Sequence, residues 1–554
     1  MSTQHDHIQD SNSSKFETEH PDKDASSQGN PEPEEKGHVS AADILSGNAT
    51  HELTHFEAKA ALINAEIDKF GFGKYQKCIW LLCGFGYFLD LAWAQGVGLM
   101  ATAVFQEMGV PADKQGLIFT CSNAGLAIGA FSIGIITDII GRKWAFELTC
   151  LITSIFGMLL AVSKFNYGAI CGIYFLSCIG LGGNIPIDAT IALEFLPQNR
   201  RYLVSLLGMW QPIGVTIASA IAYGTAARYR CSVKLPACNN VEAGEACCTV
   251  SSNMGWRYMV IIIGCMTLAI FFARYALFPF YESPKWLLSK RREQDAIDVL
   301  RKIAKFNGAE DPTLTVEHFR EVDLRYDVEN TEQAGSRDAK TYILNMFKSL
   351  DFLKDLFTKK LECFSFILLA LGYMGNYWSF NLAGYFLPIV LLSNNVDSGA
   401  DNVSDTYREY VYIYLPGVIG AIVALLSVQM PLLGRKWSLV ISAALQGLSM
   451  AMYTQVKNTA GYVGLNALEY IMQSYFNAVL YASAPEMFDT AYRASASGML
   501  SSLGRVAGIV APFAGQKYIA QGRAGVLWLG AGGIWLAAFF LCFLPIEMRN
   551  RQMY

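Results

Sequence analysis

"GIITDIIGRK" (134–143) ends an uncharged apolar run that begins at Leu117, and it places an aspartate, two glycines and a basic pair at the end of that run. An apolar run of about 18 or more residues can cross the hydrocarbon core of a bilayer as a helix. Later in the chain, "LLGRKW" (432–437) echoes the "IIGRKW" of residues 139–144. These strings predict a membrane protein whose second half repeats its first.

The composition agrees with a membrane protein. Of the 554 residues, 53% are hydrophobic and 16% are charged, and the mean hydropathy is +0.28, which is more apolar than a soluble chain of this length requires. We expect membrane-spanning helices at residues 78–100, 116–137, 144–163, 167–193, 202–226, 258–280, 363–393, 411–433, 437–456, 460–484, 499–520 and 524–545. The predicted fold is therefore an all-α membrane protein with twelve transmembrane helices in two six-helix repeats.

Two soluble segments divide the chain. Residues 1–55 hold few bulky apolar side chains, so they cannot bury enough surface to offset the entropy of ordering, and we expect a disordered tail. Residues 281–362 are expected to form a central loop, in which "KRREQDAIDVLRKIAKFNG" has apolar positions at helical spacing. The two halves are then residues 70–280 and 363–548.

Short basic loops set the expected orientation. Six plus six helices place both termini on one side, together with "GRK" (141–143) and "KRR" (290–292), and the positive-inside rule makes that side cytoplasmic. We expect a multi-pass protein of the plasma membrane with both termini in the cytoplasm. The loop at 227–256 then lies outside, where its four cysteines predict one or two disulfides of open connectivity, with free thiols as the alternative. These cysteines are Cys231, Cys238, Cys247 and Cys248.

The opening string suggests a clasp. Gly134 and Gly141 would let two helix ends approach closely, and Asp138 would gain a basic or helix-N-terminal partner at the membrane interface. Such a clasp can hold one conformation and break in another, whereas the alternative is a simple topology anchor in a tight loop. Repetition favours the clasp, because "EFLPQNRR" (194–201) and "EMFDTAYR" (486–493) both place a glutamate seven residues before an arginine.

The second copy of the clasp departs from the first. Pro431 stands where the aspartate would stand, and Ser427 replaces the glycine. We therefore expect the clasp of the C-terminal half to be weaker than that of the N-terminal half.

Two further motifs are "YESPKWLL" (281–288), which opens the central loop, and "LPIEMRNR" (544–551) near the chain end. With the clasp strings they resemble the major facilitator superfamily, and within it the sugar-porter-related branches that include fungal phosphate:proton symporters and synaptic-vesicle-type orphan transporters. The resemblance covers residues 70–551 and implies a rocker-type transport cycle with a site near the midplane between the halves. The cytoplasmic gate that it implies consists of Gly134, Asp138, Gly141, Arg142, Lys143, Glu194, Arg201, Glu282, Glu486 and Arg493.

The motifs that would fix the solute differ from the family patterns. "GNYWSFNLAGYF" (375–386) keeps the asparagine and tyrosine of the sugar-porter pattern but lacks its glutamine pair, which argues against a hexose. The fourth helix is similar to that of phosphate symporters, yet Asn184 stands at the aspartate position and Asp188 follows about one helical turn later. That change argues against phosphate. The expected solute-binding residues are Asn184, Gln211, Asn376, Trp378, Asn381, Tyr385 and Arg505.

Ionisable side chains inside the predicted spans need a physical reason, because a charge there costs at least about 2.5 kcal/mol unless it is paired, neutralised or facing water. Asp90 lies thirteen residues after Lys77, which is ~19 Å into the membrane and near its middle. We expect Asp90 to carry the coupling proton, with Asp188 and Glu469 as further proton-coupling candidates.

Two arginines, Arg505 and Arg274, also lie inside or near the predicted spans. Glu469 and Arg505 lie at similar expected depths on neighbouring helices, so we expect them to pair. The alternative leaves Arg505 to hold an anionic group of the solute while Glu469 titrates. Arg274 precedes the central loop by only seven residues, and we expect it to snorkel to the surface.

These observations predict a secondary active transporter that carries a small polar solute or organic anion by alternating access. The carboxyls inside the spans predict that transport is coupled to proton symport. No phosphate-binding G-x-x-x-x-G-K-[ST] string is present, so an ion gradient must drive transport. A proton-antiport exporter and a non-transporting solute sensor are the alternatives. We expect no enzyme activity, cofactor, metal or nucleic-acid partner; the expected partners of this monomer are a small-molecule substrate, protons and the lipid bilayer.

Overall fold

The computed structural model describes residues 55–111, 114–162, 166–232, 235–242, 245–326, 357–358, 360–397, 403–430, 432–453, 459–488, 492–519 and 523–545. The predicted tail up to residue 54, most of the second part of the central loop and the end of the chain lie outside these residues. Within the described residues the ordered elements are helices, and β-structure is limited to one isolated bridge between Ala237 and Cys248.

The predicted helices of both halves are present. In the N-terminal half they are α3 (Lys74–Met108), α4 (Leu117–Ile140), α5 (Arg142–Ala161), α6 (Tyr167–Phe195), the continuous α7 (Leu203–Leu206), η3 (Leu207–Met209) and α8 (Trp210–Gly224), and α9 (Gly255–Phe272) with the π-helical η6 (Ala273–Leu277). In the C-terminal half they are α15 (Lys360–Asp397), α16 (Val403–Tyr414) with α17 (Gly417–Gln429), α18 (Gly434–Tyr453), α19 (Thr459–Glu486), α20 (Arg493–Ile519) and α21 (Arg523–Leu541). The predicted fold of two six-helix repeats is confirmed. Seven of the described spans are long and apolar enough by length and composition to cross a membrane.

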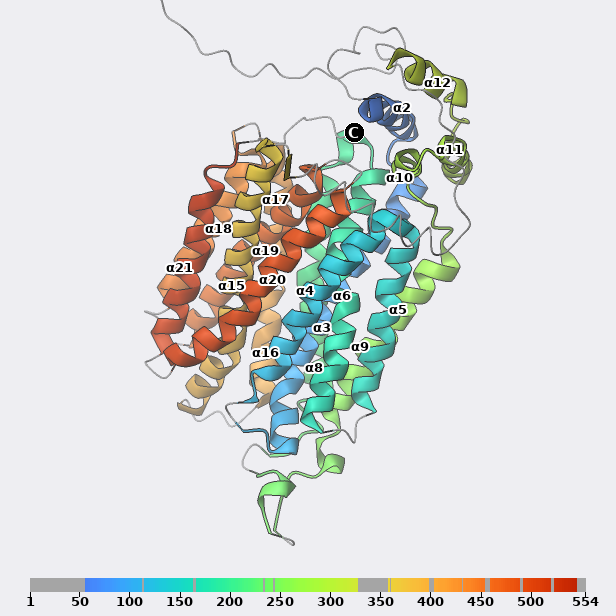
Figure 1. Cartoon of the computed structure of the whole chain (residues 1–554). Helices are drawn as coiled ribbons and strands as arrows, with labels where there is room; N and C mark the ends of the chain where they lie inside the picture. Colours follow the sequence, from blue (N-terminus) through green and yellow to red (C-terminus); the bar gives the residue numbers. More distant parts are fainter. Residues whose placement is uncertain are drawn as a thin grey trace, which may run out of the picture. The chain divides into compact units, whose positions relative to one another are not determined.

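The two halves meet along α4 and α20 and along α8 and α16 (Figure 1). Glycines make the first contact close. A Cβ added at Gly498 of α20 would lie 2.3 Å from the carbonyl oxygen of Ala130, and one added at Gly134 of α4 would lie 2.9 Å from the carbonyl oxygen of Ala494. Because backbone oxygens cannot move aside as a flexible side chain can, the two helices approach this closely only through glycine.

Short helices pack at the end of α3 where Lys74 lies, which we call the clasp end because it also carries the 141–143 loop. They are α10 (Pro284–Ser289), α11 (Glu293–Asn307), α12 (Val316–Arg325) and α2 (His55–Phe70). Helix α11 was predicted, whereas α2 was not. Its Lys59 is buried and forms ion pairs with Glu293 and Asp323 of the central loop, so α2 is held by charges that its own sequence pattern does not reveal.

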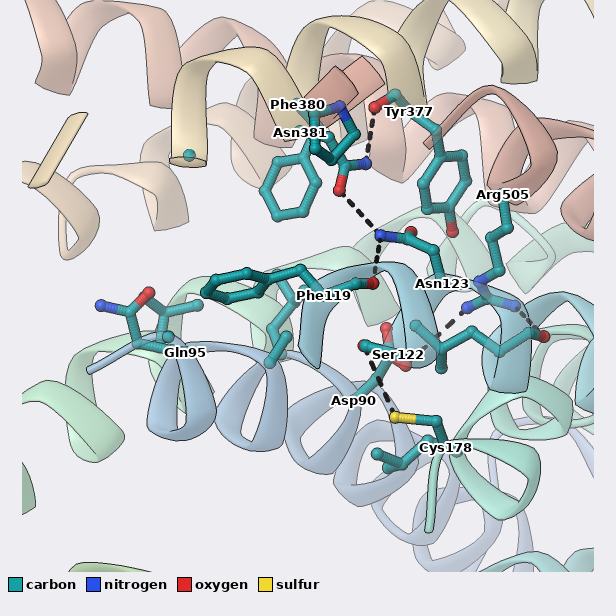
Figure 2. A pocket seen from close by; sticks show the side chains of 18 of the residues that line it. Asp90, Gln95, Phe119, Ser122, Asn123, Cys178, Tyr377, Phe380, Asn381 and Arg505 are labelled. Atoms are coloured by element: carbon teal, nitrogen blue, oxygen red, sulfur yellow. Dashed lines mark hydrogen bonds and ion pairs between the residues drawn. The ribbon is translucent and has the colours of Figure 1, made fainter. Parts of the chain in front are cut away.

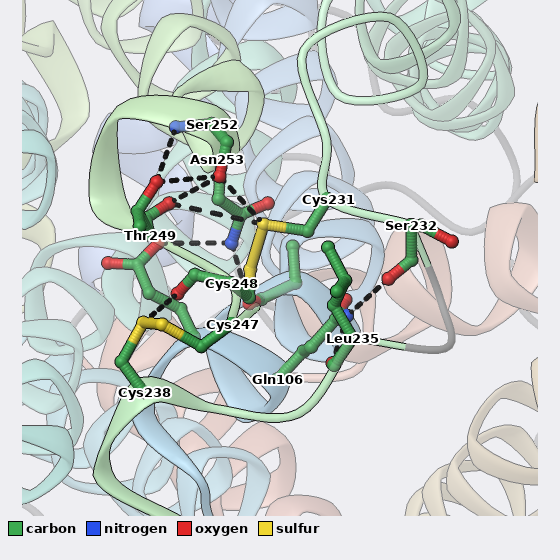
Figure 3. Close-up of a disulfide and its surroundings, with 12 residues drawn as sticks. Gln106, Cys231, Ser232, Leu235, Cys238, Cys247, Cys248, Thr249, Ser252 and Asn253 are labelled. Carbon is green, nitrogen blue, oxygen red and sulfur yellow. Dashed lines mark hydrogen bonds between the residues drawn. A yellow bond between two sulfur atoms is a disulfide. The ribbon is translucent and has the colours of Figure 1, made fainter. Parts of the chain in front are cut away.

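The opposite end of α3, the disulfide end, carries the cysteine-rich loop (Figure 3). Cys231 is bonded to Cys248 and Cys238 to Cys247, so all four predicted cysteines form bonds and the open connectivity resolves into two nested bridges. Gln106 of α3 donates through its Nε2 to the carbonyl oxygens of Ser232 and Leu235. The loop is therefore fixed to the end of the first span.

A buried carboxylate anchors the far side of the same loop. Glu107 Oε1 and Oε2 lie 2.6 and 3.0 Å from the guanidinium nitrogens of Arg257, and Glu107 Oε2 also accepts from Trp256 Nε1 (3.1 Å) and Asn253 Nδ2 (3.0 Å). Such a paired and fully hydrogen-bonded carboxylate is the arrangement that makes a buried charge tolerable. The sequence did not indicate this contact, because Glu107 and Arg257 are separated by 150 residues.

Candidate functional site

A cavity of about 690 Å³ lies between the halves and is lined by side chains of α3, α4, α6, α8, α15, α16, α19 and α20 (Figure 2). A cavity of this size accommodates a ligand larger than a simple ion. Aromatic side chains supply much of its wall, and these include Phe119, Tyr174, Tyr377, Phe380, Tyr414 and Tyr481.

One ion pair at this cavity joins the two halves. Arg505 of α20 has its Nη2 3.9 Å from Oδ1 of Asp90 on α3. Arg505 Nη1 also donates to the carbonyl oxygens of Gly182 (3.1 Å) and Leu126 (3.3 Å), which belong to α6 and α4. A single arginine of the C-terminal half is thus held by three helices of the N-terminal half. At 3.9 Å the guanidinium neutralises the charge of Asp90 without a short hydrogen bond to it.

Two amide pairs lie beside the ion pair. Asn123 Nδ2 of α4 donates to Asn381 Oδ1 of α15 (3.0 Å), a second polar link between the halves, and Asn376 Nδ2 donates to Asn477 Oδ1 (2.8 Å). Gly508 leaves room for the first pair, since a Cβ there would lie 2.7 Å from Asn123 Oδ1. Asn123 and Asn477 were not predicted. An asparagine inside a span carries no charge that would mark it as functional, and the sequence does not show which way its side chain faces.

The predicted solute-binding residues divide into two groups. Asn376, Asn381 and Arg505 line the cavity, whereas Asn184, Gln211 and Trp378 do not. Trp378 turns to the other side of α15 and donates from Nε1 to the carbonyl oxygen of Leu529 (3.1 Å). Successive helical residues point about 100° apart, so Trp378 faces away from the cavity that Tyr377 lines. The side chain of Tyr385 lies outside the described residues.

The predicted proton-coupling carboxyls lie in three different places. Asp90 lines the cavity, whereas Asp188 lies inside the N-terminal half, with its Oδ1 3.6 Å from Arg274 Nη2. Glu469 Oε1 accepts from Gln446 Nε2 (3.1 Å) inside the C-terminal half. Asp188 and Glu469 are absent from the cavity wall.

Two expected arginine contacts are wrong. Arg505 pairs with Asp90 and not with Glu469, because similar depth in two helices does not decide which way each side chain points. Arg274 does not snorkel: its side chain is completely buried and donates from Nη2 to the carbonyl oxygen of Leu82 (2.9 Å). The nearby Asp188 offers it a buried anion, which the sequence separation of the two residues conceals.

At the clasp end, the expected charged residues come together. Arg142 Nη2 lies 3.1 Å from Asp138 Oδ1 and 3.1 Å from Glu194 Oε1. Asp138 Oδ2 accepts from the backbone N (2.8 Å) and the Oγ (2.7 Å) of Ser495, in the first turn of α20. Glu194 Oε1 lies 3.9 Å from Arg493 Nη1 of the other half. The first clasp therefore holds its own half together and also reaches the second half.

Glu282 fixes the loop between α4 and α5. Its Oε1 accepts from the backbone N of Arg142 (2.8 Å) and its Oε2 from that of Lys143 (3.3 Å), so Lys143 enters the contact through its backbone. Burial raises the pKa of Glu282, while these backbone donors lower it. Gly141 has φ 107°, and a Cβ there would lie 2.2 Å from Glu282 Oε2. The glycine is required both for backbone conformation and for space.

The remaining gate candidates belong to a second cluster. Arg435 pairs with Glu486 inside the C-terminal half. Arg201 Nη2 donates to Asn64 Oδ1 of α2 (3.3 Å) and its charge interacts with that of Glu486. Each half thus ends in an arginine–glutamate pair whose glutamate faces an arginine of the other half.

Comparison with known proteins decides the family. The family model described as "Sugar (and other) transporter" matches residues 81–554. The chain belongs to this transporter family. The MFS siderochrome iron transporter 1 of Ceriporiopsis subvermispora is 33% identical over 504 residues, which are 90% of this chain and 92% of that protein. The Synaptic vesicle 2-related protein of Bos taurus is 23% identical over 518 residues, covering 89% and 82%.

The fold of the family has a solved counterpart. The proton:xylose symporter XylE shares the fold with a TM-score of 0.62 at 17% identity, covering 86% of this chain and 98% of that one. Membership in the major facilitator superfamily, predicted from the clasp strings, is confirmed. The chain is an integral, multi-pass membrane transporter of small molecules and not an enzyme.

Proposed function

We propose that this transporter is a proton-coupled symporter of an organic anion. The observation that carries the proposal is the Asp90–Arg505 pair, which joins the halves at the cavity. An anionic solute is a competitor for the Arg505 guanidinium. Asp90 then loses its counter-charge in a poorly hydrated site, where an unpaired carboxylate is costly and a protonated one is not. Anion and proton are therefore taken up together.

The lining of the cavity supports an organic anion over a hexose. Arg505 is the only cationic side chain in the described wall, and it lies among tyrosine and phenylalanine rings with four asparagine amides. The guanidinium can hold a carboxylate in two parallel hydrogen bonds. The rings offer apolar contact to the body of the solute. A neutral hexose has no group that would use the charge of this guanidinium.

The same groups explain how binding would drive movement. In this conformation Arg505 holds carbonyl oxygens of α4 and α6, so displacing it from Asp90 loosens a contact between the halves. The clasp end is closed by Asp138 and Ser495, while the cavity wall extends to Gln115 and Gly116 at the opposite end of α4. We infer an outward-facing carrier with the clasp end in the cytoplasm of a cell whose plasma membrane contains it.

The test is transport by purified protein in liposomes under an imposed pH gradient, with labelled benzoate and succinate as anions and xylose as the neutral sugar. Anion accumulation is expected when the solute side is acidic. Asp90→Asn should lose accumulation while anion exchange continues, and Arg505→Gln should lose both. Glu107→Gln is the matched control, because it alters a buried carboxyl that is paired with Arg257 outside the cavity wall, and it should keep accumulation.

Other outcomes would separate the alternatives. Unchanged accumulation in Asp90→Asn would refute the coupling mechanism. Accumulation that requires the opposite gradient would identify an antiport exporter. Binding of an anion without flux in any gradient would identify a sensor, and preferential transport of xylose would refute the assignment of an anion.

A further inference from the structure

A second buried ion pair lies inside the N-terminal half, outside the cavity wall. Asp188 of α6 and Arg274 of the π-helical turn η6 (Ala273–Leu277) are both completely buried, with 3.6 Å between Oδ1 and Nη2. Arg274 Nη1 also lies 3.0 Å from Cys150 Sγ of α5, and the guanidinium lies over the ring of Phe146, 3.6 Å from its centre. This π-helical turn ends the span that begins with α9, and short π-helical stretches are frequent at functional sites.

The carboxylate of this pair is left without hydrogen bonds. Neither oxygen of Asp188 has a hydrogen-bond partner, and the same holds for both amide atoms of Asn184 and the hydroxyl of Tyr87. Buried polar atoms in proteins are nearly always hydrogen-bonded, and groups of this kind commonly hold internal water. These three side chains on α3 and α6 therefore form a polar cluster whose atoms have no hydrogen-bond partner in the protein.

The cluster continues from the cavity. Tyr87 interacts electrostatically with both Asp90 and Asp188. Asp188 lies against the backbone of α3, since a Cβ added at Gly86 would be 1.6 Å from its Oδ2. Gly86 is one helical turn before Asp90, a separation of ~6 Å along the helix. Asp188 in turn precedes Glu194 of the clasp by six residues on α6, or ~9 Å. The cluster thus leads from the cavity toward the clasp end.

The Glu107–Arg257 pair shows what a saturated buried pair looks like in this molecule. Both oxygens of Glu107 accept from Arg257, at 2.6 and 3.0 Å, and two further donors complete its hydrogen bonding. Asp188 has one guanidinium at 3.6 Å and no hydrogen bond. The first arrangement saturates the hydrogen-bonding capacity of its carboxylate, whereas the second leaves oxygens free to accept a proton.

We propose that Asp188 is a second proton site of the symporter, reached from Asp90 through water held by Tyr87 and Asn184, with Arg274 as the positioning residue. This inference rests on the proposed function. In the step, the Asp90 carboxyl releases a proton to water and Asp188 takes one up, so that Asp90 returns to its ionised form beside Arg505. No other bond is made or broken. The titratable and charged groups that face Asp188 are Cys83, Tyr87 and Asp90 from α3, Cys150 from α5, and Arg274.

The first test follows proton entry with a dye enclosed in liposomes during benzoate uptake. In Asp188→Asn, proton-driven accumulation should fall 10-fold or more while benzoate exchange, which needs the cavity alone, continues. Asp188→Glu should restore coupling. Tyr87→Phe keeps the ring and removes the hydroxyl, and it should slow coupled uptake several-fold. Glu107→Gln alters a buried pair outside the path, and its coupling ratio of protons to benzoate should stay at the wild-type value.

A second measurement needs no solute. Infrared difference spectra between alkaline and acidic buffer report protonated carboxyls, and Asp188→Asn should remove one such band, while Tyr87→Phe should shift that band by changing its hydration. If Asp188→Asn folds poorly because Arg274 loses its counter-charge, the double variant with Arg274→Met should recover folding without recovering coupling.

The outcomes distinguish this inference from the function on which it rests. Wild-type accumulation and an unchanged infrared band in Asp188→Asn, or wild-type coupled uptake in Tyr87→Phe, would overturn the second proton site and leave symport through Asp90 standing. Wild-type accumulation in Asp90→Asn would instead overturn the proposed function itself.

Discussion

The two halves of the molecule end in corresponding charged clusters that share one contact and differ in another. In the first, Arg142 pairs with Glu194, and in the second, Arg435 pairs with Glu486. Both pairs join the start of one helix to the end of another within the same half. The first cluster adds Asp138, for which the second has Pro431. The repeat has thus kept the pair that holds each half together.

The differing contact is the one that Asp138 makes to the other half. Asp138 accepts from the backbone and hydroxyl of Ser495 at the start of α20, where the helix dipole favours a negative charge. Gly134 and Gly498 allow the close approach on this side, while the corresponding positions on the α17–α7 side are Ser427 and Leu206. Closure of the clasp end is therefore strong along α4 and α20 and has no equivalent carboxylate on the other side.

The largest expected effect comes from removing the arginine of each pair. Arg142→Gln leaves Asp138 and Glu194 buried without their shared guanidinium, and breaking a buried pair typically costs about 3–5 kcal/mol. Arg435→Gln leaves one carboxylate, Glu486, and should cost less. Thermal unfolding of the purified variants in detergent would measure both. An equal or larger loss in Arg435→Gln would remove the distinction between the clusters.

Asp138→Asn tests the contact between the halves. The amide keeps the size of the side chain but loses the charge that strengthens its bonds to Ser495 and Arg142, and hydrogen bonds to a charged group contribute about 1.5–3 kcal/mol. The free energy of the closed conformation should rise by that amount relative to a conformation open at the clasp end, so the open conformation should become more populated. Distances between spin labels on α4 and α20 would measure the shift, with Glu486→Gln as the comparison on the other side. Unchanged distances in Asp138→Asn would contradict the assignment of Asp138 to closure.

The clasp and the spans could be predicted because their signals are local. Apolar length defines a span, and the spacing of Glu194 and Arg201 is repeated at Glu486 and Arg493. Counting residues also placed Asp90 far from both ends of the first span, and the structure has Asp90 in the wall of the cavity between the halves. These features need no knowledge of which neighbour a helix face meets.

The partners of the site residues could not be predicted because direction around a helix is set by tertiary packing. Arg505 was expected to meet Glu469 at similar depth, but it faces α4 and α6 of the other half. Trp378 follows Tyr377 directly, yet only Tyr377 lines the cavity. Asn123 bridges to Asn381 across the halves, a contact between residues that the sequence separates widely. Pairing between repeats is the information that a single sequence lacks.

The central loop adds a buried cation to the clasp end. Lys285 of α10 is buried beside the first cluster, and its pKa lies well below the ordinary lysine value because of burial and because Arg201 and Arg493 are near. The folded protein therefore binds this proton less readily than the unfolded chain does. The free energy of unfolding should fall as pH falls from the ordinary lysine pKa toward the depressed one, and the loss is fully present below both.

Lys285→Met should remove that penalty. Replacing a buried charged group by an apolar one of similar size is often stabilising, and we expect about 1 kcal/mol, at the lower end of such gains. Unfolding measured between neutral and alkaline pH should show a flatter profile in Lys285→Met than in the wild type. A steeper or unchanged profile would mean that Lys285 is stabilised by its neighbours in the first cluster.

The smallest expected effect comes from giving the second cluster the missing carboxylate. Pro431→Asp places an aspartate four residues before Arg435, as Asp138 stands four residues before Arg142, and the position corresponding to Ser495 is Leu203 at the start of the fifth span. A carboxylate near a helix start contributes about 0.3–1 kcal/mol. The gain should stay in that range because Leu203 has no hydroxyl and the glycine contact is absent.

In the Asp138→Asn background, spin-label distances should show partial return to the closed conformation. Pro431→Asn, which lacks only the charge, is the control: if it closes the clasp end as well as Pro431→Asp does, then the glycines of α4 and α20, and not the carboxylate, separate the two clusters.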